Sequence, residues 1–241
     1  MVVRQEFVLR VPEGLDLTRA APLLCAGTYS PLRTWGVGPG SRVGVIGLGG
    51  LGHMAVKLAA GLGAHVTVMS RTAEKRADAL ALGADQLLVS ADEDAMAKAQ
   101  SSFDLIIDTI PAKHDISPYM PLLDVDGTLV IVGHLGNLNE PFTGPLIMGW
   151  RRVAGSPIGG IAETQDAARL RAGLFGCCRA GDVFPTGRPA SRLRVGAERR
   201  CRRVFGSFLV ASFSPADPIA ELRPVHVVRA ASVLHRLYPL A

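Results

Sequence analysis

The sequence is poor in cysteine, has no long apolar run, and contains no lysine from residue 171 onward. Its four cysteines favour free thiols or metal ligands over a disulfide framework. No apolar run approaches the roughly 20 residues that a membrane-spanning helix needs, so we expect no membrane partner. The residues after Met1 lack the apolar core of a signal peptide, and we therefore expect a cytoplasmic protein.

The charge of the chain changes near Leu170. The overall net charge of +5 is an average of two unlike parts. Residues 171–241 contain 12 arginines and four acidic residues, whereas all four lysines and a net negative charge belong to residues 1–170. We therefore expect a boundary near Leu170. Three of the four cysteines lie beyond it, at Cys177, Cys178 and Cys201.

Residues 171–241 are interpreted as an irregular, arginine-rich tail. Natural surfaces use both lysine and arginine, so arginine alone suggests a tail that is translated out of its ancestral frame, or is disordered and unrelated to the fold. The alternative is an ordinary basic extension that folds onto the sheet edge. A third hypothesis is nucleic-acid binding, but residues 192–203 lack the interleaved aromatic residues that stack on bases. Only loose phosphate attraction remains, so we expect no specific nucleic-acid partner.

The pattern that organises the chain is a glycine motif in residues 41–52. A short apolar strand is followed by G-x-G-x-x-G and by a helix that begins at His53. Gly47 permits a tight turn, Gly49 leaves room for the backbone to approach a pyrophosphate, and Gly52 lets the helix pack closely on the strand. The helix points its free N–H groups and its positive dipole end at the phosphates. The motif predicts a dinucleotide site, and a glycine-rich turn without function is the alternative.

Strands and helices alternate along the rest of the chain up to Leu170. The segment Phe103–Asp108 is apolar on both faces, as in the buried strands of parallel sheets. Short connections and regular alternation predict an α/β fold with a doubly wound parallel sheet, the Rossmann architecture. The predicted strands are 41–46, 64–69, 86–89, 103–108, 127–133 and 152–158, and the predicted helices are 53–60, 73–82, 92–99, 113–123 and 163–170.

The end of the second predicted strand distinguishes NAD from NADP. An Asp or Glu there, about 20 positions past the first glycine, would bond the ribose 2′-hydroxyl of NAD and repel a 2′-phosphate. This sequence has Ser70 and Arg71 instead, with Lys75 shortly after. A hydroxyl, a guanidinium and an ammonium suit a phosphate dianion, so we expect NADP. The alternative is that Arg71 and Lys75 are only the solvated start of a helix.

A series of motifs resembles the zinc-dependent medium-chain alcohol dehydrogenases, and especially their cinnamyl alcohol dehydrogenase branch. The resemblance covers roughly Glu6–Leu170, and the order of the motifs is more specific than any one of them. The motifs are Leu24–Gly27, Gly47–Lys57, Leu82–Asp85, Phe103–Thr109, Asp126–Gly133 and Gly155–Gly159.

The resemblance implies a cofactor site, a metal ligand and a reaction. Cys25 matches a cysteine that binds the catalytic zinc of the family; a small buried thiol with no ligand role is the alternative. The complete relatives interconvert aldehydes and primary alcohols, so the implied partner is such a small molecule, and we expect a homodimer. The residues implied to line the NADP site are Thr28, Gly47, Leu48, Gly49, Gly50, Leu51, Gly52, Ser70, Arg71, Lys75, Thr109, Gly133, Ser156, Pro157 and Ile158.

Parts of the family pattern are absent from this sequence. In the family, a preceding β-rich domain supplies a first cysteine ligand, a Gly-His-Glu motif and a four-cysteine zinc lobe, and we expect this chain to begin close to where that domain ends. His53 and His134 follow glycines, but neither precedes a glutamate. A catalytic zinc needs three protein ligands, which one thiolate cannot provide. We therefore interpret residues 1–37 as a remnant of the catalytic domain with its connecting helix, and residues 38–170 as the NADP-binding domain.

The resulting hypothesis is an NADP-dependent oxidoreductase of the zinc-type alcohol dehydrogenase family, present mainly as its cofactor-binding domain. The activity of this chain alone is open, because zinc-site residues are missing. The rival hypothesis is a non-catalytic NADP-binding module or an inactive fragment. No residue is identified as catalytic, since Asp104 and Asp108 are interpreted as framing a strand rather than forming an acid–base pair.

Overall fold

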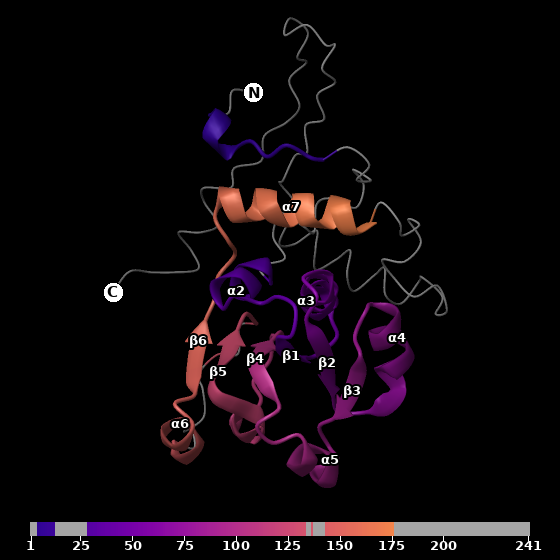
Figure 1. Cartoon of the computed structure of the whole chain (residues 1–241), viewed down its shortest axis with the longest axis vertical. Helices are drawn as coiled ribbons and strands as arrows, with labels where there is room; N and C mark the ends of the chain where they lie inside the picture. The colour runs from indigo at the N-terminus through magenta and orange to yellow at the C-terminus, as the bar shows by residue number, and fades with distance from the viewer. Residues whose placement is uncertain (1–3, 13–27, 134–135, 137–142, 176–241) are drawn as a thin grey trace, which may run out of the picture.

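The computed structural model describes residues 4–12, 28–133, 136 and 143–175 (Figure 1). Within these ranges, a six-stranded parallel sheet has the order β3-β2-β1-β4-β5-β6, which Figure 1 shows from right to left. The predicted doubly wound α/β fold is therefore confirmed. The strands are β1 (Arg42–Ile46), β2 (His65–Ser70), β3 (Gln86–Val89), β4 (Phe103–Asp108), β5 (Leu123–Ile131) and β6 (Arg152–Gly155).

Helices connect the strands in both halves of the sheet. No helix in the described ranges is both long enough and apolar enough to cross a membrane. The α-helices are α2 (Tyr29–Thr34), α3 (Gly50–Gly61), α4 (Arg76–Ala81), α5 (Glu93–Lys98), α6 (Gly144–Met148) and α7 (Ile161–Phe175). The 3₁₀-helices are η1 (Gln5–Phe7), η3 (Ala73–Lys75) and η4 (Ser117–Leu122).

The direction of strand addition reverses between β1 and β4. From β1 the chain adds β2 and β3 on one side, and it then returns to add β4, β5 and β6 on the other. Because crossovers between parallel strands are right-handed, the reversal places the connecting segments of the two halves on opposite faces of the sheet. Beyond the carboxyl ends of β1 and β4 the connecting loops diverge, and this is where parallel α/β sheets bind ligands.

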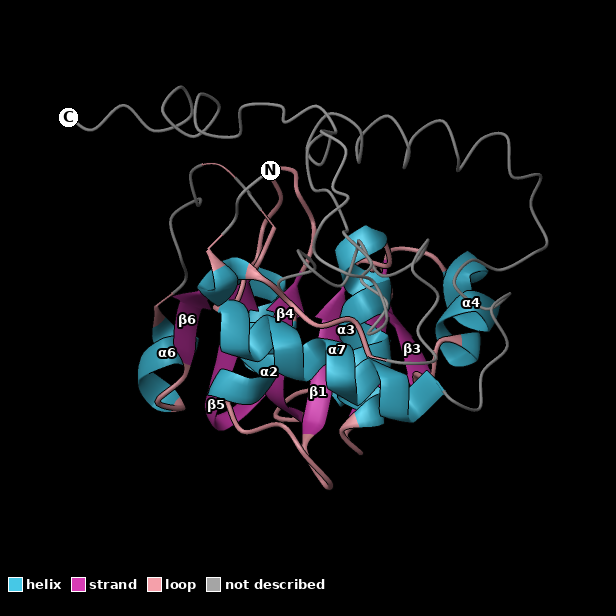
Figure 2. Cartoon of the chain, turned by 90° about the horizontal axis from the view of Figure 1, so that it is seen from above, coloured by secondary structure: helices cyan, strands magenta, loops and turns pink. Residues whose placement is uncertain are grey.

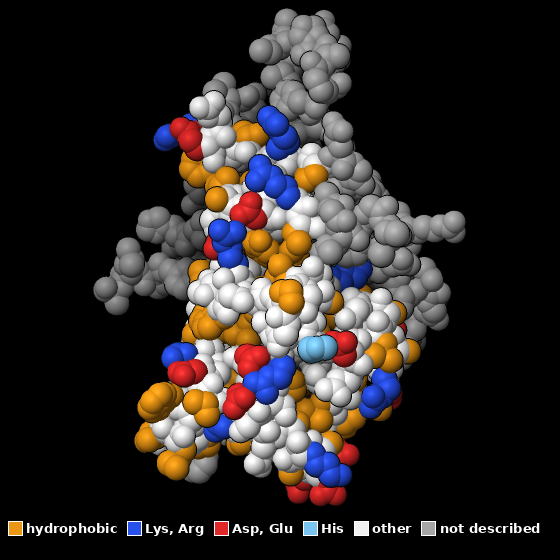
Figure 3. All heavy atoms as spheres, viewed as in Figure 1, with side chains coloured by type: hydrophobic (Ala, Val, Ile, Leu, Met, Phe, Trp, Pro, Cys, Tyr) orange, Lys and Arg blue, Asp and Glu red, His pale blue; other side chains and the backbone are white. Residues whose placement is uncertain are grey.

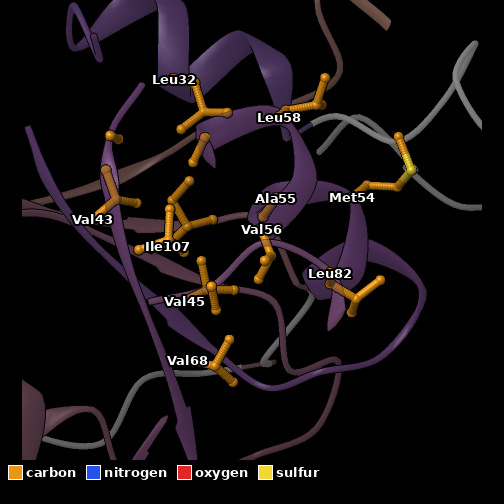
Figure 4. Packing of buried hydrophobic residues seen from close by; sticks show 14 of the residues in the cluster. Leu32, Val43, Val45, Met54, Ala55, Val56, Leu58, Val68, Leu82 and Ile107 are labelled. Carbon is orange, nitrogen blue, oxygen red and sulfur yellow. The ribbon is translucent and has the colours of Figure 1, made fainter. Parts of the chain in front are cut away.

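The larger hydrophobic core lies between α3 and the central strands. Figure 4 shows Ala55 and Val56 of α3 close to Val45 of β1 and Val68 of β2. All four side chains are fully buried. Removing a valine side chain from water stabilises a fold by about 1.5–3 kcal/mol, so this packing holds the start of α3 against the end of β1.

A second core covers the opposite face of the sheet. Its members from η4 and the preceding loop are Ile116, Tyr119, Met120 and Leu122, which pack with Ile106 of β4. Leu146 of α6 and Met96 of α5 are partly buried against the same cluster. Both faces of the sheet are therefore apolar, as predicted for buried parallel strands.

Helix α7 packs mainly on α2 and α3, and Figure 1 shows it above both of them. Figure 2 shows the same helix from above, in front of the sheet. Arg33 of α2 pairs with Asp166 of α7 across 2.9 Å. The Gln165 side chain of α7 accepts a hydrogen bond from the Arg10 N–H and donates one to the Arg10 carbonyl, each at 2.8 Å. These contacts tie the N-terminal segment 4–12 and α2 to the domain.

The helix predicted over residues 113–123 is wrong. Residues 113–116 are irregular, and only Ser117–Leu122 is helical, as a 3₁₀-helix. Pro118 and Pro121 lie within it. Proline has no N–H to donate and clashes with the preceding turn, so an α-helix cannot continue through these positions.

The boundary predicted at Leu170 lies inside a helix. Helix α7 runs from Ile161 to Phe175 without a break at that residue. The rest of the predicted tail, from residue 176 onward, lies outside the described residues, together with its three cysteines. The character of the tail therefore stays a prediction, as does the division at residue 37.

Candidate cofactor-binding site

The glycine motif forms the turn between β1 and α3. Gly47 has a φ of +85°, a left-handed conformation that residues with side chains rarely adopt. Its N–H donates to the Met69 carbonyl at 3.1 Å, which holds the turn beside the end of β2. A side chain at Gly49, the N-cap of α3, or at Gly50 would meet nothing within 4 Å. The turn thus leaves open space at the start of α3, as a bound pyrophosphate requires.

Gly52 allows α3 to approach the turn very closely. A Cβ atom added there would lie 2.1 Å from the Gly47 carbonyl oxygen, which is closer than real Cβ atoms come to a backbone oxygen. Leu48 is partly buried against the larger core, and Leu51 belongs to the first turn of α3. The turn and packing roles predicted for Gly47 and Gly52 are those the structure shows, while contact of the motif with a cofactor stays a prediction.

Two positively charged residues, Arg71 and Lys75, follow the end of β2, which is hydrogen-bonded to the glycine turn. Ser70 is the last residue of β2 and follows Met69, which receives the Gly47 hydrogen bond. Arg71 and Lys75 are exposed, and within the described ranges neither forms an ion pair with a carboxylate. This edge therefore offers two available positive charges and a hydroxyl to an anion.

Thr109 bonds the backbone of the glycine turn, and its predicted contact with a cofactor stays a prediction. It is buried, and its Oγ1 donates to the Ile46 carbonyl at 2.8 Å, with a longer contact of 3.3 Å to the Gly47 carbonyl. The Thr109 N–H also donates to Ile46, at 3.1 Å. Thr109 therefore braces the backbone of the glycine turn from the end of β4, a role that no sequence pattern indicated.

The loops after β4, β5 and β6 lie side by side. A Cβ atom at Gly133 would be 2.6 Å from the Ile110 carbonyl oxygen, and the Ser156 N–H donates to the Ile131 carbonyl at 3.1 Å. Pro157 and Ile158 follow and are exposed. Because carboxyl ends of parallel strands share one edge of a sheet, these residues continue the edge that begins at the glycine turn.

Thr28 lies at the start of α2, a helix that contacts α3. It is the N-cap residue of α2 and is fully buried. Its predicted contact with a cofactor stays a prediction.

A buried pair that the sequence did not reveal lies just behind this edge. The Asp108 Oδ2 atom is 3.1 Å from His114 Nε2, and Asp108 has no exposed surface. Burial raises the pKa of the Asp108 carboxyl, whereas the Ile110 N–H and His114 act in the opposite direction. His114 lies in an irregular loop, so no periodic pattern could connect it with Asp108. Asp104 instead pairs with Arg42 at the amino ends of the strands, where it frames β4 as expected.

The described residues do not fit a catalytic zinc. They contain no group of three or more His, Cys, Asp or Glu side chains placed to hold a metal. Cys25 and His134 lie outside the described residues. Because a catalytic zinc needs three protein ligands, we derive no step through a metal.

A comparison with protein families identifies the chain. The family model described as zinc-binding dehydrogenase matches residues 50–172, from the start of α3 into α7. The chain belongs to the zinc-binding dehydrogenase family. The predicted family resemblance is therefore confirmed.

Curated relatives are identical to this chain at about half of the aligned positions. A probable cinnamyl alcohol dehydrogenase of Lolium perenne is 52% identical over 177 residues, which cover 70% of this chain and 48% of that protein. NADP-dependent alcohol dehydrogenase C 1 of Mycolicibacterium smegmatis is 50% identical over 187 residues, covering 77% of this chain and 52% of that one. The chain thus spans about half the length of these relatives.

Solved structures of related enzymes have the same fold over the same part of the chain. A cinnamyl alcohol dehydrogenase of Sorghum bicolor matches with a TM-score of 0.68 and 46% identity, over 71% of this chain and 50% of that one. CAD from Helicobacter pylori, complexed with NADP(H), matches with a TM-score of 0.63 and 38% identity, over 72% of this chain and 50% of that one.

Proposed function

We propose that this zinc-binding dehydrogenase chain is the NADP-binding part of an oxidoreductase that interconverts aldehydes and primary alcohols. The names of its relatives support the reaction, since cinnamyl alcohol dehydrogenases and an NADP-dependent alcohol dehydrogenase are about 50% identical to it. The NADP(H) complex of the Helicobacter pylori enzyme supports the cofactor.

The observation that carries the cofactor proposal is the end of β2. Arg71 and Lys75 are exposed next to the glycine turn, and Ser70 stands where NAD-binding chains place a carboxylate. An Asp or Glu there would repel the 2′-phosphate, whereas a guanidinium donates several N–H groups to it. The 2′-phosphate of NADP would therefore bind Ser70, Arg71 and Lys75.

The remaining residues of the edge position the cofactor. The first N–H groups of α3 would bind the pyrophosphate, because the missing side chains at Gly49 and Gly50 leave it room. Thr109 holds the carbonyl groups of Ile46 and Gly47 in place. The glycine turn would therefore keep its shape when the negatively charged pyrophosphate binds. Gly133 and Ser156–Ile158 would line the site further along the edge. Bound NADPH supplies the hydride that an aldehyde accepts.

The alternative is a non-catalytic NADP-binding module or an inactive fragment. Its support is that the described residues contain no group of three or more His, Cys, Asp or Glu side chains placed to hold a metal. An NADPH-linked aldehyde reduction assay, together with metal analysis of the purified chain, distinguishes the two: turnover with bound zinc favours the enzyme, and NADPH binding without turnover favours the module.

Titration of the two cofactors tests the proposal. Wild type should bind NADPH more tightly than NADH. Arg71→Asp should lose about 1.5–3 kcal/mol of NADPH binding, which is roughly tenfold to 150-fold, because it removes a charge-assisted contact and adds a repulsive charge. Lys98→Asp is the matched control, since Lys98 is an exposed lysine on α5, on the other side of the sheet from α3. Equal affinity of wild type for both cofactors, or an unchanged preference in Arg71→Asp, would refute the assignment.

We further propose that the chain forms a homodimer through the edge of the sheet at β6. Four large apolar side chains are exposed there: Val125 at 63%, Ile147 at 71%, Met148 at 85% and Trp150 at 73%. Figure 3 shows hydrophobic side chains gathered at the lower left, where Figure 1 places α6. The Asp126 N–H donates to the Gly149 carbonyl at 2.8 Å, so the two segments that carry these side chains are adjacent. Such a patch on a sheet edge favours a partner surface of the same kind.

A further inference from the structure

The hydroxyl group of Thr109 joins the end of β4 to the glycine turn. Its Oγ1 donates to the Ile46 carbonyl, 63 residues earlier in the chain, at 2.8 Å, and it lies 3.3 Å from the Gly47 carbonyl oxygen. The Ile46 carbonyl also receives the Thr109 N–H at 3.1 Å. Because Thr109 is buried, water competes little for these acceptors. One side chain thus holds two successive carbonyl groups of the turn.

The same hydroxyl group lies against the first turn of α3. A Cβ atom added at Gly52 would be 3.1 Å from Thr109 Oγ1, and one added at Gly47 would be 3.2 Å from it. The hydroxyl group therefore fills the space between the turn and the helix, where glycine leaves room for it. Threonine is β-branched and has few side-chain rotamers, so its oxygen keeps this position. Strand β4, the glycine turn and α3 thus meet at one oxygen atom.

Holding these carbonyl groups also sets the direction of the next backbone N–H. A trans peptide unit is planar, and its C=O and N–H groups point in opposite directions. The Gly47 carbonyl faces Thr109, so the Leu48 N–H of the same peptide unit points away from Thr109. Within the described ranges, this N–H has no hydrogen-bond acceptor. It precedes Gly49 and Gly50, where an added side chain would meet nothing within 4 Å, and it is therefore available to an anion at the start of α3.

We propose that Thr109 is a positioning residue for the cofactor, whose hydroxyl group holds the Leu48 N–H and the start of α3 where they bind the pyrophosphate. This role rests on the proposed NADP binding. Thr109 acts through the backbone of the glycine turn and needs no contact with the cofactor. It supports the binding of the pyrophosphate, which NADPH and NADH share, and it leaves the choice between the two cofactors to the residues at the end of β2.

The experiment titrates NADPH and NADH into the full chain and its variants. Thr109→Val replaces the hydroxyl group by a methyl group of similar size, and both affinities should fall about threefold to tenfold, the size expected for one neutral hydrogen bond. Because both cofactors contain the pyrophosphate, the ratio of the two affinities should stay within about twofold of wild type. Thr109→Ser keeps the hydroxyl group, so it should bind each cofactor within about twofold of wild type.

Thr128→Val is the matched control for Thr109→Val. Thr128 on β5 is 1% exposed and Thr109 is 6% exposed, but within the described ranges the Thr128 Oγ1 has no hydrogen-bond partner. Loss of its hydroxyl group should therefore leave both cofactor affinities unchanged. Urea unfolding of each variant measures stability separately from affinity. If Thr109→Val fails to fold, Thr109→Ala removes the same hydroxyl group without placing a methyl group against the carbonyl oxygens.

Three results would overturn the positioning role while leaving NADPH binding intact. The first is wild-type affinity in folded Thr109→Val or Thr109→Ala, since the hydroxyl group would then serve stability alone. The second is a loss in Thr109→Ser or Thr128→Val as large as that in Thr109→Val. The third is a fall in NADPH affinity with NADH affinity unchanged. Absence of NADPH binding by the wild-type chain overturns the proposed function and the positioning role with it.

Discussion

The three glycines of the G-x-G-x-x-G motif, Gly47, Gly49 and Gly52, differ in which atoms a side chain at each position would meet. Gly47 needs a left-handed backbone, Gly49 faces open space, and Gly52 is pressed against a carbonyl oxygen. The same residue type therefore serves conformation at one position, ligand access at the next and packing at the third. Substitutions at Gly49 and Gly52 should accordingly affect different properties.

Gly52→Ala should lower stability, and Gly49→Ala should lower cofactor affinity. At Gly52 the added methyl group meets backbone that cannot move aside, which should cost about 1–3 kcal/mol of unfolding free energy or more. At Gly49 the cost should be below about 1 kcal/mol. The methyl group there occupies the approach of the pyrophosphate, so NADPH affinity should fall on the order of tenfold.

Urea unfolding and NADPH titration of both variants check this division. Gly38→Ala is the control, because an added Cβ atom would meet nothing within 4 Å and the position precedes the motif. Equal losses of stability in Gly49→Ala and Gly52→Ala would contradict the assigned roles.

The role of a single residue could be predicted where the backbone requires a certain residue type at a fixed spacing. It could not be predicted where a side chain contacts a residue that is distant in the sequence. The G-x-G-x-x-G spacing specified Gly47 and Gly52 because their roles are local. The hydrogen bond from Thr109 to the Ile46 carbonyl was not predicted, because it joins residues that are far apart in the sequence. The His114–Asp108 contact depends on how an irregular loop folds back onto β4, which no local pattern encodes.

At the scale of elements, the strands were predicted more reliably than the connections. All six strands overlap predicted apolar runs, because burial on both faces leaves a continuous apolar signal, although β5 begins at Leu123, before the predicted strand 127–133. The helix predicted over residues 113–123 was wrong, because Pro118 and Pro121 do not allow an α-helix to continue through this segment. The strand predicted to reach residue 158 ends at Gly155, before Pro157, whose lack of an N–H suits a loop.

The outer edge formed by β6 and α6 has properties that packing among the described residues does not explain. Trp150 is 73% exposed. It also has a φ of +49°, in the left-handed region that bulky residues rarely adopt. A large apolar side chain that is exposed on a residue with this unfavourable backbone conformation indicates that the surface contacts another protein chain.

If that surface joins two chains, Met148→Lys should shift the protein toward monomer. A lysine at the centre of an apolar interface loses its hydration, and the dimer dissociation constant should rise at least about tenfold. Analytical ultracentrifugation at several concentrations measures this shift. Leu80→Lys is the control, because Leu80 is 46% exposed on α4, which packs at the opposite edge of the sheet. A wild type that stays monomeric at tens of micromolar, or a dimer indifferent to Met148→Lys, contradicts the proposal.

At the scale of the molecule, the described residues contain a six-stranded parallel sheet, and the chain belongs to the zinc-binding dehydrogenase family. The relatives are about twice as long as the matched region, so the reaction is a proposal for this chain. The preference for NADP over NAD, unlike the reaction, depends only on residues of this chain. The residues proposed to bind the 2′-phosphate all lie on β2, on η3 and in the turn between them. The preference can therefore be measured on this chain as it is.

The most direct measurement compares binding of 2′,5′-ADP and 5′-AMP to the wild-type chain. These fragments differ only in the 2′-phosphate, and neither requires the nicotinamide half of the site. If Ser70, Arg71 and Lys75 bind that phosphate, calorimetry should give 2′,5′-ADP at least about tenfold the affinity of 5′-AMP, and this advantage should disappear in Arg71→Asp. Equal affinity of the wild-type chain for the two fragments would contradict the account.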